Sequence, residues 1–136
     1  MQESISGIRV LLVEDREDVR AIATMMLTRL GCSVVAVATA EAALAVLEKP
    51  GDRIQVVFAD IQLPGAMSGY DLAKRISGQW PGVRTVITSG AANTQVIRGA
   101  ARHEGYRVIG KPYNSSDLLN AIRQALAAPP PSPPPP

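Results

Sequence analysis

Five short runs of apolar, strand-forming residues recur along this chain of 136 residues, and a segment of helical character separates each run from the next. The third run contains Val56–Ala59, a continuously apolar stretch that is typical of a strand buried on both faces of a sheet. Alternation of strands and helices favours a parallel sheet with right-handed crossovers and helices on both faces. The expected strands are 8–13, 33–37, 54–60, 83–88 and 106–110.

The intervening segments predict helices. In the first, apolar residues recur at the spacing of one helical face, and they are Val19, Ile22, Ala23, Met26, Leu27 and Leu30. Further helices are expected over about 40–48, 69–78 and 93–102, and after Asn114 or Ser115 with a buried stripe of Leu118, Leu119, Ile122 and Leu126. Thr39, Ser68 or Gly69, and Asn114 or Ser115 are candidate starting residues, and Asp15 is a candidate cap for the first helix.

Among doubly wound α/β folds, the flavodoxin-like (βα)5 arrangement with strand order 2-1-3-4-5 fits five strands. It places the first and third strands side by side, and ligands bind beyond the carboxyl ends of such strands. Polar residues follow the strands at that edge: Glu14 and Asp15, Asp60, Ser89, and Lys111. The sequence therefore predicts a site where three acids, a hydroxyl and an amine meet.

Three adjacent carboxylates repel one another unless cations compensate their charge. Lys111 supplies one cation, and an all-oxygen set with few protein carboxylates favours Mg²⁺ over a caged Ca²⁺. A carboxylate beside Mg²⁺ can attack a phosphoryl donor in line and form an acyl phosphate. These residue types predict phosphoryl transfer to an aspartate.

Four motifs occur in order on the expected strand ends: Leu11-Leu-Val-Glu-Asp15, Asp60-Ile-Gln-Leu-Pro64, Ser89-Gly90 and Lys111-Pro-Tyr113. Together they resemble the receiver domain of two-component response regulators, of the stand-alone, chemotaxis-regulator-like kind, from about residue 8 to residue 126. The resemblance implies that Asp60 accepts phosphate from a sensor histidine kinase or a histidine phosphotransfer protein. It also implies that such a domain catalyses only its own phosphorylation and dephosphorylation.

The same resemblance implies roles for the neighbouring residues. Mg²⁺ would be held by Glu14, Asp15, Asp60 and the backbone carbonyl of Gln62. Ser89 matches the switch hydroxyl and Lys111 the invariant lysine, and Pro112 would follow a cis peptide bond. The family's switch aromatic lies three residues before the lysine, where this chain has Val108; Tyr106 lies five before and is not assigned that role. Gln62 and Ala91 would line the path of the hydrolytic water and tune the lifetime of the acyl phosphate.

Composition bounds the remaining classes of function. Hydrophobic content of 46% and charged content of 19% are ordinary for a soluble domain. A net charge of +2 without a basic cluster gives no reason to expect direct binding of nucleic acid. The single cysteine, Cys32, is expected to be a buried apolar residue. The sequence shows no signal peptide and no membrane-spanning segment, which predicts a cytoplasmic protein. The expected organisation is a flexible 1–7, a receiver domain over 8–128 and a disordered proline-rich tail over 129–136.

Other functions stay open at this point. A metal-dependent phosphatase of the haloacid dehalogenase type also uses an aspartyl phosphate, but it places a second acid where this chain has Gln62. A flavin-binding module shares the topology, but it needs a Ser/Thr/Gly-rich phosphate loop after the first strand, and this chain has none there.

A receiver without an output domain would signal through a downstream protein, or a homodimer, at the face of the fourth helix, fifth strand and fifth helix. The chain could instead be a fragment of a longer regulator or hybrid kinase, although Met1 mildly favours a stand-alone protein.

Overall fold

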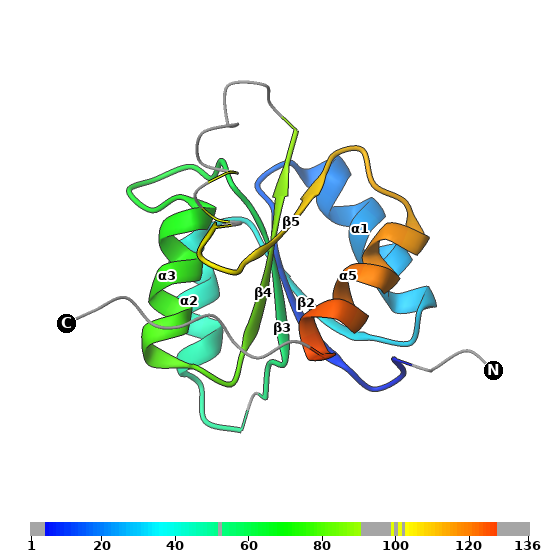
Figure 1. The fold of residues 1–136 in the computed structure, drawn as a ribbon, viewed down its shortest axis with the longest axis horizontal. Coiled ribbons are helices and arrows are strands. Elements are labelled where there is room, and N and C mark those ends of the chain that lie inside the picture. The colour runs from blue at the N-terminus through cyan, green and yellow to red at the C-terminus, as the bar shows by residue number, and fades with distance from the viewer. Residues whose placement is uncertain (1–4, 52, 91–98, 100, 102, 128–136) are drawn as a thin grey trace.

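The computed structural model describes residues 5–51, 53–90, 99, 101 and 103–127. In this part of the chain the strands form a five-stranded parallel sheet of order β2-β1-β3-β4-β5, with helices on both faces (Figure 1). The predicted fold class and strand order are confirmed. The elements are β1 (Arg9–Val13), α1 (Glu17–Arg29), β2 (Ser33–Val37), α2 (Ala40–Glu48), β3 (Val56–Asp60), α3 (Gly69–Gln79), β4 (Arg84–Ser89), β5 (Arg107–Gly110) and α5 (Ser115–Ala127).

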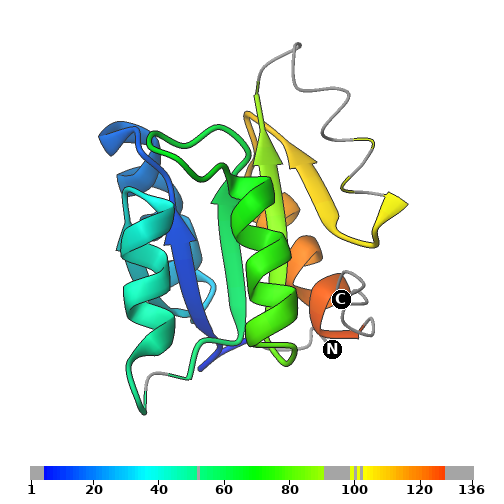
Figure 2. The same cartoon turned by 90° about the vertical axis from the view of Figure 1, so that its left-hand side faces the viewer.

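The middle of the sheet is almost entirely buried. In β1 and β3 every residue except Arg9 and Asp60 is buried, whereas the outer strands β2 and β5 are partly exposed. Because all the strands run in the same direction, their carboxyl ends meet at one edge of the sheet, marked by the arrowheads in Figure 2. The register sets Asp60 opposite Thr88, and Ser89 opposite Gly110.

Two apolar layers fix the helices against the sheet. Successive strand residues point to opposite faces, so Leu12 and Phe58 pack with α1 and α5, while Leu11 and Val57 pack with α2 and α3. Figure 1 shows these two pairs of helices on opposite faces of the sheet. Cys32 lies buried in the first of these clusters, as predicted.

Three helices begin at polar caps that the sequence predicts. The side chain of Thr39 accepts a hydrogen bond from the amide of Ala42, and Ser68 and Asp71 form a reciprocal capping box at the start of α3. Asn114 and Asp117 exchange the same pair of bonds at the start of α5. At α1 the prediction is wrong: the capping position is Arg16, not Asp15, and the Arg16 side chain makes no capping hydrogen bond.

Two residues of the predicted apolar helix faces are exposed. Ile22 of α1 is 56% exposed, because it faces an open pocket rather than a packed neighbour. Leu126 is 38% exposed, because it lies in the last turn of α5 beyond the sheet-facing Ala125. The helix predicted over 93–102 falls largely outside the described residues, as does the proline-rich tail. No helix in the described ranges is long and apolar enough to span a bilayer.

Candidate functional site

Three acids converge at the carboxyl edge of the sheet. Glu14 and Asp15 follow β1, and Asp60 ends the adjacent strand β3. Each offers a carboxylate oxygen within 4.8 Å of those of the other two. Adjacent parallel strands end side by side, so this convergence follows from the strand order that the sequence predicts.

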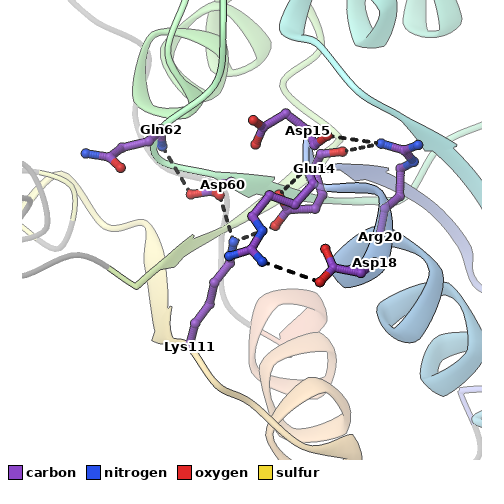
Figure 3. Close-up of polar contacts among 8 residues, drawn as sticks. Glu14, Asp15, Asp18, Arg20, Asp60, Gln62 and Lys111 are labelled. Carbon is purple, nitrogen blue, oxygen red and sulfur yellow. Dashed lines mark hydrogen bonds and ion pairs between the residues drawn. The ribbon is translucent and has the colours of Figure 1, made fainter.

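Lys111 brings the fixed positive charge of this site. Its ammonium donates hydrogen bonds to Oε1 of Glu14 and, at 2.7 Å, to Oδ2 of Asp60 (Figure 3). Burial alone lowers the pKa of the Lys111 amine, but the hydrogen bonds with Asp60 and Glu14 outweigh burial and leave this pKa above its ordinary value. The peptide bond from Lys111 to Pro112 is cis, as predicted.

The acidic pair is also held by its own loop and by the first turn of α1. Glu14 is 2% exposed, and its Oε2 accepts a hydrogen bond from the amide of Arg16 at 3.0 Å. The guanidinium of Arg20 donates to the backbone carbonyls of Glu14 at 2.9 Å and Asp15 at 3.5 Å (Figure 3). Neither arginine was singled out from the sequence, although both lie within six residues of Glu14.

The loop after β3 orients Asp60 from its other side. The amide of Gln62 donates to Oδ1 of Asp60 at 3.1 Å, and the Gln62 side chain points away from the acids (Figure 3). The two oxygens of Asp60 therefore have different partners, Gln62 on one side and Lys111 on the other.

Ser89 and the aromatic residues have distinct places. Ser89 is the buried last residue of β4, and its backbone carbonyl accepts from the amide of Lys111 at 2.8 Å. Val108 packs in β5 beside the small cluster that contains Tyr106. The phenol of Tyr106 is buried and hydrogen bonds to Ser77 and to the carbonyl of Ala73 in α3. Tyr106 lies directly before β5 and therefore anchors the start of that strand to α3. The predicted switch role of Ser89 stays a prediction.

A cavity of about 500 Å³ opens above Asp60. Its polar part is lined by Arg16, Asp60, Gln62 and Lys111, and its apolar wall is formed by α1 and the segment after β5, with Val19, Ile22, Ala23, Met26, Pro112 and Tyr113. The apolar wall was not predicted, because the sequence pattern placed Ile22 on the apolar face of a helix without showing what that face meets. The cavity gives a reactant access to a carboxylate that is itself mostly buried.

The donor set fits a hard divalent cation. The clustered donors are carboxylate oxygens, and Lys111 pairs with Glu14 and Asp60 but not with Asp15. Of these three clustered acids, Asp60 also lines the cavity.

Comparison with known proteins agrees with this geometry. Residues 10–123 match the family model described as "Response regulator receiver domain". An NtrX-like response regulator of Rickettsia bellii is 32% identical over 89% of this chain, and the regulatory protein TcrA of Mycobacterium tuberculosis is 31% identical over 88%. The chain spans only 25% and 46% of the lengths of these two relatives.

A solved structure gives the same result. The CheY-like receiver domain protein from Methanospirillum hungatei JF-1 superposes with a TM-score of 0.78 at 29% identity, covering 89% of this chain and 94% of that one. The family match does not favour the alternative of a haloacid dehalogenase-type phosphatase. The chain belongs to the family of response regulator receiver domains.

Proposed function

We propose that this receiver accepts a phosphoryl group on Asp60 and passes the signal on by protein–protein contact. The observation that carries this proposal is the arrangement around Asp60: one carboxylate oxygen is bonded to Lys111, the other to the Gln62 amide, and an open cavity lies above both. A nucleophile needs such access, and its orientation needs fixed partners.

In the proposed step, an oxygen of Asp60 forms a bond to the phosphorus of the donor. The bond from phosphorus to the leaving group breaks, and the leaving group departs with the electron pair. Lys111 lies within hydrogen-bond reach of the reacting carboxylate, so its charge can stabilise the oxygens of the transferred group. Ser89, at the end of β4, would donate a hydrogen bond from its hydroxyl to the phosphoryl group on Asp60.

Glu14, Asp15 and Asp60, with the backbone carbonyl of Gln62, would hold Mg²⁺. The metal supplies charge neutralisation for the phosphoryl oxygens. The buried Glu14 carboxylate is already oriented by Lys111 and by the amide of Arg16, so folding preorganises this part of the set. Support for the choice of Mg²⁺ comes from the all-oxygen donors, which suit hard cations.

We infer partners for two surfaces of the receiver. We place the donor, a sensor histidine kinase or a histidine phosphotransfer protein, over the apolar wall, where Ile22 is 56% and neighbouring Met25 49% exposed. A second cavity of about 400 Å³ is lined by β5 and α5, including Val108 and Gln124, and a downstream protein or a second copy would bind at that face. We assign residues 8–128 to the receiver domain and 129–136 to a tail outside it.

The test is incubation with acetyl phosphate and Mg²⁺, followed by intact-mass measurement. We expect one added phosphoryl group on the wild type and none on Asp60→Asn or after chelation of the metal. Asp71→Asn, which changes an exposed carboxylate of the α3 capping box, is the matched control and should be phosphorylated normally. Absence of the adduct from the wild type, or multiple turnover of phosphate monoesters, would refute the proposal.

A further inference from the structure

The side chain of Arg16 is a cation that lines the cavity above Asp60, and no role has so far been assigned to it. It follows directly after Glu14 and Asp15, and its amide donates to Oε2 of Glu14 at 3.0 Å. This bond fixes the backbone of Arg16 beside the acids, while its side chain lines the same cavity as Asp60, Gln62 and Lys111.

Among the described residues, Lys111, Arg20 and Arg16 are cations near the acids, and they have very different partners. Lys111 is mostly buried and bonded to two carboxylates, and Arg20 is bonded to two backbone carbonyls. The guanidinium of Arg16 instead meets the carboxylate of Asp18 at 3.4 Å, and both side chains are about two-thirds exposed, at 67% and 68%. An exposed pair of this length contributes little stability, so exchanging Asp18 for another anion costs little.

The charges in the cavity favour such an exchange. A phosphoryl group brings about −1.5 to −2 charges and strong acceptor oxygens to a site that already holds three acids. A guanidinium matches phosphoryl oxygens with two parallel hydrogen bonds, a geometry that an ammonium lacks. Arg16 carries this group at the cavity, on a side chain that a weak contact leaves easy to redirect.

We propose that Arg16 is a phosphoryl-binding residue: its guanidinium leaves Asp18 and binds the oxygens of the group that is transferred to Asp60. Asp18 is then a competing partner that holds Arg16 when no phosphoryl group is present. This inference rests on the proposed function. This exchange replaces the ion pair with Asp18 by an ion pair with the phosphoryl group, and no proton moves. The covalent step is unchanged: the phosphoryl group passes from the donor to Asp60, and the leaving group departs.

The first test measures the rate of phosphorylation by acetyl phosphate with Mg²⁺. Arg16→Gln should lower the rate about fivefold, the size expected for one exposed charged contact, and Arg16→Lys should recover part of it. Arg29→Gln removes the same charge from the last turn of α1 and serves as the matched control, with an unchanged rate. Arg16 is exposed, so these variants should keep the fold, which circular dichroism checks.

The second test separates direct contact from a general effect of charge. Asp18→Asn should raise the rate, because it frees Arg16. In the double variant with Arg16→Gln, the effect of Asp18→Asn should vanish, since no guanidinium remains to be released. If Asp18→Asn raises the rate equally in both backgrounds, Asp18 acts through its field alone and the proposal is wrong.

A third readout needs no chemical step. Beryllofluoride, a phosphoryl mimic, should bind the Mg²⁺-loaded Arg16→Gln protein about fivefold more weakly than the wild type by calorimetry, with Arg29→Gln unchanged. Equal affinities and equal rates for Arg16→Gln and the wild type would overturn the inference while leaving the proposed function intact. A wild type that accepts no phosphoryl group would overturn the proposed function itself.

Discussion

At the scale of single residues, the site depends on contacts between segments that are far apart in the sequence. Lys111 reaches Glu14 across 97 positions and Asp60 across 51. Each contact requires that the sheet has already placed the strand ends together. Local contacts then orient the acids. The backbone amides of Arg16 and Gln62 donate hydrogen bonds to the carboxylates of Glu14 and Asp60. The Arg20 guanidinium donates to the backbone carbonyls of the acidic pair.

Arg20 gives a prediction at this scale. Arg20→Met removes both hydrogen bonds to the loop that carries Glu14 and Asp15, so these acids become less well oriented. Loss of such a supporting contact should weaken Mg²⁺ binding about tenfold, and Arg20→Lys should weaken it less. Calorimetric titration with Mg²⁺ measures this, with Arg29→Met as the control on the same helix. Equal affinity in Arg20→Met and the wild type would contradict the assigned role.

At the scale of elements, the start of α3 lies unusually close to the strand that carries Asp60. The amide of Gly69 donates to the carbonyl of Ile61 at 3.1 Å. A Cβ atom at Gly69 would lie 2.0 Å from the carbonyl oxygen of Asp60, a backbone atom that cannot yield without moving the site. This glycine is therefore required by packing, because only a residue without a side chain permits the approach.

The two glycines of α3 should respond in opposite directions to alanine. Gly69→Ala should destabilise the fold by about 1–3 kcal/mol or more, through overpacking against the backbone of Asp60. Gly78→Ala, at an exposed position where a Cβ meets nothing within 4 Å, should stabilise it by about 0.5–1 kcal/mol through higher helix propensity. Urea denaturation measures both. A Gly69→Ala protein as stable as the wild type would show that the approach is looser than described.

At the scale of the whole molecule, the side chains of three tyrosines tie separate elements together. Tyr106 joins β5 to α3, Tyr70 of α3 donates to Glu104 at 2.7 Å, and Tyr113 packs against the core under α1 and α5. The hydrogen bond to Glu104 raises the pKa of Tyr70 to about 12, with burial adding to it. Burial raises the pKa of Tyr106 and of Tyr113 above the ordinary 10.0.

These shifts predict lower stability in alkali. Folding favours the protonated phenols, so the unfolded chain releases their protons first as the pH rises. The free energy of unfolding should therefore be unaffected by the tyrosines below pH 10 and should fall between about pH 10 and 12. Denaturation at a series of pH values tests this, together with phenolate absorbance of the native protein. Tyr70→Phe should remove the component that titrates near pH 12, and native tyrosines ionising at the ordinary pH would contradict the prediction.

Much of this protein was predictable from local patterns. Strand and helix alternation gave the sheet order, because few ways exist to wind five parallel strands with short connections. The caps at Thr39 and Ser68 were predictable because a helix start depends on residues within three positions. The meeting of Glu14, Asp15 and Asp60 follows from the same order, since neighbouring parallel strands end together.

The sequence by itself thus determined the fold class and which acids share the edge of the sheet. Only the tertiary structure decided how α1 sits over that edge, and this placement exposes Ile22 and brings Arg16 to the cavity. It also decided that Lys111 bridges two acids and that only glycine fits at position 69. The physical reason is that periodicity encodes which face of a helix is apolar. What that face and the helix ends contact depends on the packing of elements that are distant in the chain.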